Sequence, residues 1–155
     1  MGAKIMLIED DADTRQGLIL RLRANHYETA WAQDAISAVA MTVREKPDLI
    51  LLDLGLPGGD GFLVMERLQS LALFVPIIVL SGRDPAFNRE RALRSGAAAF
   101  LQKPADNEEI LAVIRKMLPS NSALSDARKE NNRSFTRMEG ESDSTFKVWS
   151  NGTSA

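Results

Sequence analysis

The sequence contains no cysteine and only one histidine, His26. The lack of cysteine excludes disulfides, thiolate zinc sites and a cysteine nucleophile, and it fits a reducing compartment. With one histidine, histidine-rich metal sites and a serine–histidine triad supported by further histidines are disfavoured. His26 lies between Asn25 and Tyr27, a polar setting typical of a solvated loop between a helix and a strand.

The sequence also lacks long apolar runs and any excess of positive charge. No stretch approaches the roughly 18 apolar residues that a membrane span needs, and the first residues lack the basic-then-apolar pattern of a signal peptide. The net charge is −2, without the basic patch that a nucleic-acid surface requires. We therefore expect a cytoplasmic protein that binds neither membrane nor nucleic acid, with a single core of ordinary size in 155 residues.

A run of four aliphatic residues leads directly into a carboxylate at Asp53. The run is LILL at residues 49–52, a pattern typical of a strand buried on both faces of a parallel sheet. An unpaired carboxylate inside such a strand would be costly, so Asp53 is expected at its C-terminal end. In open α/β sheets, ligands bind at that end.

Two further strand-like runs end in charged residues. Residues 5–8 (IMLI) are followed by Glu9, Asp10 and Asp11, and residues 99–102 (AFLQ) are followed by Lys103 and Pro104. If these strands are parallel neighbours of the run at 49–52, a cluster of carboxylates and one lysine meet at a single sheet edge. That arrangement is typical of a magnesium and phosphoryl site.

Strand-like and helix-like segments alternate five times along the chain. The strands are predicted at about 4–9, 27–31, 48–53, 76–80 and 98–102, and the helices at about 12–25, 34–46, 60–71, 85–95 and 106–118. This alternation predicts an α/β fold, a parallel sheet with helices on both faces. Asp34 and Asp106 are candidate helix N-caps, and Glu109 would complete a capping box with Asp106. The order of the strands does not follow from these patterns.

The composition changes after residue 118. Residues 119–155 are rich in serine and asparagine, carry balanced charges and have only scattered large apolar residues, so this segment is expected to be a disordered tail or a truncated linker. An alternative is a docking peptide with FKVW at residues 146–149 as its anchor. The predicted organisation is therefore a domain at 1–118 followed by a polar tail at 119–155.

Four sequence segments together resemble the receiver domain of two-component response regulators. They are LIEDD at residues 7–11, LLDLGLPGGDG at 51–61, VLSG at 79–82 and FLQKP at 100–104, and the resemblance covers about residues 3–118. It implies a flavodoxin-like, doubly wound (βα)5 sandwich with strand order 2-1-3-4-5, and a bacterial origin.

The resemblance implies that Asp53 is a phosphoacceptor, since a carboxylate can form an acyl phosphate. It also implies a Mg²⁺ (or Mn²⁺) ion that lowers the repulsion between Asp53 and the incoming phosphoryl group. The implied metal ligands are Asp10, Asp53, the backbone carbonyl of Gly55 and, through a water molecule, Glu9. Asp11 and Asp13 are instead interpreted as residues at a helix start.

The remaining implied site residues bind the phosphoryl group or respond to it. Lys103 pairs with Asp53 before the reaction and with phosphoryl oxygens after it, and its bond to Pro104 is expected to be cis. Ser81 donates its hydroxyl to a phosphoryl oxygen, and Ser81 and Phe100 form the conformational switch. Because Phe100 has no hydroxyl, that switch works by packing alone.

Two further positions, Gly55 and Arg83, flank this site and are expected to influence how fast the acyl phosphate hydrolyses. Gly55 leaves the phosphoryl group open to water, whereas Arg83 could reach over it. The resemblance does not decide which influence dominates.

The implied partners are a histidine kinase or phosphotransfer protein and an output protein. The output protein would bind the face made by the fourth helix, fifth strand and fifth helix, at about residues 92–118, and a homodimer could use the same face. The alternative is a phosphorylation-independent interaction module, but such receivers usually lack the acceptor aspartate, an acidic residue or the lysine, all present here. A haloacid-dehalogenase-like phosphatase needs Asp-x-Asp, whereas Leu54 and Gly55 follow Asp53.

Overall fold

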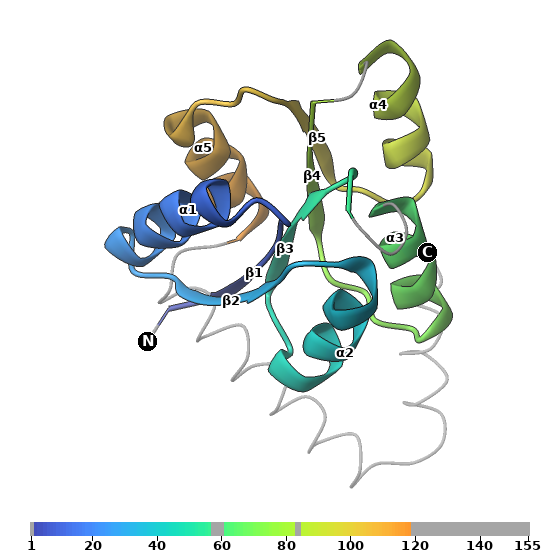
Figure 1. Cartoon of the computed structure of the whole chain (residues 1–155), viewed down its shortest axis with the longest axis horizontal. Helices are drawn as coiled ribbons and strands as arrows, with labels where there is room; N and C mark the ends of the chain where they lie inside the picture. Colours follow the sequence, from blue (N-terminus) through green and yellow to red (C-terminus); the bar gives the residue numbers. More distant parts are fainter. Residues whose placement is uncertain (1, 57–60, 83–84, 119–155) are drawn as a thin grey trace, which may run out of the picture. The chain divides into compact units, whose positions relative to one another are not determined.

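The computed structural model describes residues 2–56, 61–82 and 85–118, and within these ranges five strands alternate with five helices (Figure 1). The strands are β1 (Lys4–Ile8), β2 (Glu28–Ala32), β3 (Leu49–Asp53), β4 (Ile77–Ser81) and β5 (Ala99–Gln102). The helices are α1 (Ala12–Ala24), α2 (Ala35–Glu45), α3 (Gly61–Ser70), α4 (Pro85–Arg94) and α5 (Asn107–Met117). The predictions for the tail at 119–155, including its possible anchor at 146–149, lie outside the described residues.

The five strands form one parallel sheet in the order β2-β1-β3-β4-β5. This confirms the α/β prediction and the strand order implied by the resemblance. The chain moves outward from β1 to β2 and then returns to β3 on the other side of β1, so the direction of winding reverses between β1 and β3. In doubly wound sheets the ligand crevice lies at this reversal.

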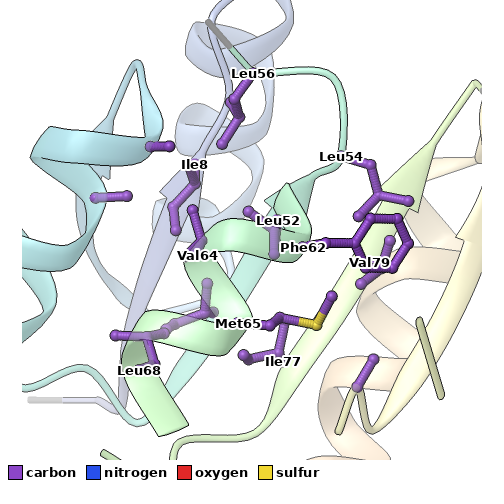
Figure 2. Packing of buried hydrophobic residues seen from close by; sticks show 14 of the residues in the cluster. Ile8, Leu52, Leu54, Leu56, Phe62, Val64, Met65, Leu68, Ile77 and Val79 are labelled. Atoms are coloured by element: carbon purple, nitrogen blue, oxygen red, sulfur yellow. The ribbon is translucent and has the colours of Figure 1, made fainter. Parts of the chain in front are cut away.

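Helices cover both faces of the sheet, with α1 and α5 on one face and α2, α3 and α4 on the other (Figure 1). The central strands are therefore buried on both sides, which explains their continuous apolar runs. On the second face, the apolar residues of α3 (Phe62, Val64, Met65 and Leu68) share one buried cluster with Leu52, Ile77 and Val79 of the sheet (Figure 2). This packing holds β3 and β4 rigidly below the ends that carry the charged residues.

Aspartates cap the starts of α1, α2 and α5. Asp34 accepts a hydrogen bond from the N–H of Ser37 at 2.7 Å, and Asp106 caps α5 by accepting from the N–H of Glu108. That partner is one residue earlier than Glu109, the residue of the expected capping box. Observed boundaries differ from the predicted ones by at most one residue, which is within the usual uncertainty at the ends of elements. In the described part of the chain, no helix is long and apolar enough to cross a membrane.

Candidate functional site

The charged residues predicted at the strand ends meet at the C-terminal edge of the sheet. Glu9 follows β1, Asp53 ends β3, Ser81 ends β4 and Lys103 follows β5. Main-chain hydrogen bonds continue past the ends of the strands. The N–H of Glu9 donates to Ala32 O at 3.1 Å, and the N–H of Lys103 donates to Ser81 O at 2.8 Å. These bonds fix the backbone at the edge of the sheet. The ends of β1, β3, β4 and β5 thereby lie at one edge of the sheet, where the side chains of Glu9, Asp53 and Lys103 meet.

Three carboxylates lie together at the centre of this edge. Glu9, Asp10 and Asp53 each offer an oxygen within 4.8 Å of the others. Their exposure is graded, since Glu9 is buried, Asp53 is partly buried and Asp10 is exposed. Carboxylate oxygens at this spacing suit a small divalent cation such as Mg²⁺, which is usually held by one or two carboxylates together with water. The donor set therefore fits the metal implied by the sequence.

Lys103 lies closer to Glu9 than to Asp53. Its Nζ is 2.7 Å from Glu9 Oε2 and 3.7 Å from Asp53 Oδ2. Burial opposes the charged ammonium, but the hydrogen bond to Glu9 and the charges of Asp53 and Glu9 outweigh it and raise the pKa of Lys103. Lys103 is thus held as a cation between two carboxylates. The resemblance pairs it with Asp53, but its shorter contact is with Glu9.

Both carboxylate oxygens of Glu9 already accept hydrogen bonds. Oε2 accepts from Lys103 Nζ at 2.7 Å and Oε1 accepts from the N–H of Asp11 at 3.2 Å. Burial raises the pKa of Glu9, the bond from Lys103 partly offsets this rise, and the nearby charge of Asp53 adds to it. Both oxygens of Glu9 are therefore engaged by protein donors, while its contact with a metal through a water molecule stays a prediction.

The turn after Asp53 depends on close backbone approach. The N–H of Gly55 donates to Asp53 Oδ1 at 3.2 Å, and the N–H of Gly61 donates to Leu54 O at 2.8 Å. A Cβ on Gly61 would lie 2.9 Å from Asp53 O and from Leu54 Cα, both backbone atoms. Only glycine fits there without a shift. Residues 57–60 of the predicted turn, like Arg83, lie outside the described residues.

The two predicted switch residues are both buried. Ser81 is fully buried at the end of β4. Phe100 is 7% exposed and belongs to the same apolar cluster as Val79 and Ala92. The Lys103–Pro104 peptide bond is cis. The burial of Phe100 shows that its ring points into the core in this structure, while the roles of Ser81 and Phe100 in a switch stay predictions.

Sequence reasoning missed a pair of residues beside the acidic cluster, Arg15 and Trp31. Arg15 Nη1 donates to the backbone carbonyl of Glu9 at 2.9 Å, and its guanidinium lies over the ring of Trp31. The sequence carries only a weak signal for the first contact, which is that Arg15 lies one helical turn beyond Asp11 and can reach back to the loop. The contact with Trp31 depends on β2 lying beside β1.

Comparison with known proteins agrees with this geometry. Residues 5–115 match the family described as "Response regulator receiver domain". The curated relatives include response regulator PleD of Caulobacter vibrioides, 35% identical over 119 residues that make up 76% of this chain and 26% of the relative. They also include response regulator MprA of Mycobacterium leprae, 37% identical over 115 residues, 74% of this chain and 50% of the relative. The chain thus spans half or less of the length of these relatives.

Solved receiver domains share the fold. The BeF3-activated receiver domain of Klebsiella pneumoniae RstA is 30% identical with a TM-score of 0.70, and the match covers 76% of this chain and 99% of that one. The receiver domain of sensor histidine kinase PA1611 from Pseudomonas aeruginosa is 28% identical with a TM-score of 0.69, covering 76% of this chain and 98% of that one. With its strand order, its acidic edge and these matches, the chain belongs to the response regulator receiver domain family, a signalling domain of two-component systems.

Proposed function

We propose that Asp53 accepts a phosphoryl group from the phosphohistidine of a histidine kinase or phosphotransfer protein, in a reaction that needs Mg²⁺ or Mn²⁺. One observation carries the proposal. Carboxylate oxygens of Glu9, Asp10 and Asp53 lie within 4.8 Å of one another, with Lys103 Nζ at 2.7 Å from Glu9 and 3.7 Å from Asp53. The PA1611 receiver domain, solved with a magnesium ion coordinated in its active-site cleft, supports the same use of this edge.

The chemistry is a transfer between two negatively charged partners. An oxygen of Asp53 attacks phosphorus, the P–N bond to the donor histidine breaks, and the released imidazole nitrogen takes a proton from water. The metal, held by Asp10, Asp53, the Gly55 carbonyl and, through water, Glu9, would supply positive charge to the phosphoryl oxygens. Lys103 supplies a second positive charge from the end of β5.

The position of Lys103 gives it two carboxylate partners before the reaction. In the unphosphorylated state, Glu9 holds the ammonium group while Asp53 stays partly exposed. After transfer, the negative phosphoryl oxygens on Asp53 compete with Glu9 for the same cation. Lys103 therefore contributes charge to the product without leaving its strand end.

The conformational response to the phosphoryl group is expected at Ser81, which ends β4, and at Phe100 in the neighbouring strand β5. Ser81 would donate its hydroxyl to a phosphoryl oxygen, and the space that it vacates would let Phe100 repack. Phe100 lies in β5, between α4 and α5, so the change would reach the α4–β5–α5 face. That face would bind a separate or attached output protein, or a second copy of the chain, inside the cytoplasm.

The test is the intact mass of the protein after incubation with acetyl phosphate or phosphoramidate and Mg²⁺. We expect a gain of about 80 Da, one phosphoryl group, that requires both the metal and Asp53. Asp53→Asn should abolish it, and Asp13→Asn, which changes an exposed carboxylate in the first turn of α1, should not. No gain with either donor would overturn the proposal and favour a phosphorylation-independent interaction module.

A further inference from the structure

A second set of contacts lies behind the acidic cluster, between α1 and β2. Arg15, in the second turn of α1, donates from Nη1 to the backbone carbonyl of Glu9 at 2.9 Å. The same guanidinium lies over the ring of Trp31, with Cζ 4.1 Å from the ring centroid. Trp31 belongs to β2, the strand beside β1. One side chain thus joins the loop after β1 to the neighbouring strand.

The bond to the Glu9 carbonyl fixes the peptide plane that leads into Asp10. That oxygen is coplanar with the N–H and Cα of Asp10, so holding it sets the direction in which the Asp10 side chain leaves the backbone. On the other side, the N–H of Glu9 is held by Ala32 O at 3.1 Å. Both peptide groups flanking Glu9 are therefore fixed to β2 or α1.

Asp10 depends on this backbone support more than its neighbours do. Glu9 is held by Lys103, and Asp53 accepts from Gly55 and pairs with Lys103. Across the described residues, no hydrogen bond or ion pair holds the carboxylate of Asp10, which is exposed. Its position as a metal ligand therefore rests on the orientation of its own backbone.

Trp31 in turn restricts Arg15. Arginine has many rotamers, and ordering it costs conformational entropy. A guanidinium stacked on an indole is stabilised by a cation–π interaction, worth about 0.5–1 kcal/mol at exposed sites, and Trp31 is 45% exposed. The ring thus holds the guanidinium at the position from which it reaches Glu9 O.

We propose that Arg15 is a positioning residue, which Trp31 holds in place and which fixes the Glu9–Asp10 peptide so that the Asp10 carboxylate is preset to bind the divalent cation. This inference rests on the proposed function only in assuming that the acidic cluster binds Mg²⁺. In this role Arg15 acts through the backbone carbonyl of Glu9 and not as a ligand of the metal or the phosphoryl group.

The direction in which Mg²⁺ affinity changes when Arg15 is removed distinguishes a positioning role from a purely electrostatic one. Arg15 is a cation near an acidic cluster, so its charge alone disfavours a second cation there. If charge were its only influence, removing Arg15 would strengthen Mg²⁺ binding. If Arg15 positions Asp10, removing it weakens Mg²⁺ binding although a repelling charge has gone.

The experiment measures the Mg²⁺ dissociation constant of the full chain by titration calorimetry. We expect Arg15→Met to weaken Mg²⁺ affinity by about tenfold, the lower end of losses seen when a residue supporting a metal ligand is removed. Arg15→Lys should recover part of the affinity, because lysine can still donate to the carbonyl but cannot stack as a planar group. Trp31→Leu should cause a smaller loss of about twofold to threefold, since Arg15 remains but is less ordered.

Arg23→Met is the matched control. Arg23 also joins α1 to β2, through a 3.0 Å bond from Nε to Thr29 Oγ1, but it lies at the far end of the helix. The substitution Arg23→Met should therefore leave the Mg²⁺ affinity unchanged. Thermal midpoints without metal, measured for every variant, separate a loss of affinity from a loss of folding.

Each outcome decides between the two proposals. A parent chain that binds no Mg²⁺ overturns the proposed function and this inference with it. A parent that binds Mg²⁺ while Arg15→Met binds equally or more tightly overturns the inference alone. Both the proposed function and this inference are supported if Arg15→Met binds Mg²⁺ more weakly, Arg15→Lys recovers part of the affinity and Arg23→Met leaves it unchanged.

Discussion

The ammonium group of Lys103 forms its shortest ion pair with Glu9, a carboxylate whose side chain is only 3% exposed. Because Glu9 is buried, Lys103 has a structural role in the metal-free protein besides any role with a phosphoryl group. An unpaired charge at that depth would be costly. The ammonium group that would contact the phosphoryl oxygens therefore also stabilises the fold before phosphorylation.

Removing Lys103 should therefore destabilise the metal-free protein. We expect Lys103→Met to lower the free energy of unfolding by about 1–3 kcal/mol, because the buried Glu9 carboxylate loses its charged hydrogen-bond donor and keeps only the N–H of Asp11. Urea denaturation measures this change. Lys4→Met is a matched control, since Lys4 pairs with Glu45 at 3.2 Å but that glutamate is 27% exposed, and such pairs are worth about 0–1 kcal/mol. Equal losses in the two variants would show that the burial of Glu9 does not matter.

Neutralising one carboxylate of the acidic cluster should stabilise the metal-free protein. Glu9, Asp10 and Asp53 repel one another at their observed spacing. We expect Asp10→Asn and Asp53→Asn each to raise the thermal midpoint without metal, and added Mg²⁺ to raise the midpoint of the parent more than that of either variant. Differential scanning fluorimetry with and without Mg²⁺ tests this. Equal or lower midpoints for both variants would contradict a converged acidic cluster.

Gly61 should not tolerate even a methyl group. A Cβ there would lie 2.9 Å from Asp53 O and Leu54 Cα, so Gly61→Ala must displace the backbone that follows Asp53, at a cost of about 1–3 kcal/mol. Gly17, within α1, has nothing within 4 Å of its added Cβ. Gly17→Ala should instead stabilise the protein by about 0.5–1 kcal/mol, because alanine favours the helix. Chemical denaturation of the two variants should move in opposite directions, and a stabilised Gly61→Ala would refute the predicted strain.

The pair between Lys4 and Glu45 should contribute to stability in a pH-dependent way. The hydrogen bond from Lys4, followed by its charge, lowers the pKa of Glu45 below its ordinary 4.5. A lowered folded-state pKa contributes stability above pH 4.5 that is lost as the pH falls through the folded-state value. Glu45→Gln should therefore weaken the decline of unfolding free energy in acid. Glu66→Gln, at an exposed position of α3, is the control, and an identical acid profile for Glu45→Gln and the parent would contradict the prediction.

Much of this protein follows from local patterns in its sequence. Continuous apolar runs such as residues 49–52 predict buried parallel strands, because a strand covered on both faces has no polar side. Charged residues such as Glu9, Asp53 and Lys103 come at the ends of these runs, since an unpaired charge within a buried strand would be costly. Aspartates such as Asp34 mark helix starts because their side chains satisfy free backbone N–H groups. The strand order came only from the family resemblance, because nothing in a strand's own residues specifies its neighbour.

The tertiary structure alone decided which carboxylate lies closest to Lys103 and how deeply each charge is buried. Lys103 and Glu9 are far apart in the sequence, and only the packing of the strands places them 2.7 Å apart and buries the glutamate. The stack of Arg15 on Trp31 likewise needs α1 to lie against β2. Sequence patterns predict the environment of a residue because solvation acts on each residue locally, whereas contacts between side chains from different elements depend on distances that only the folded chain sets.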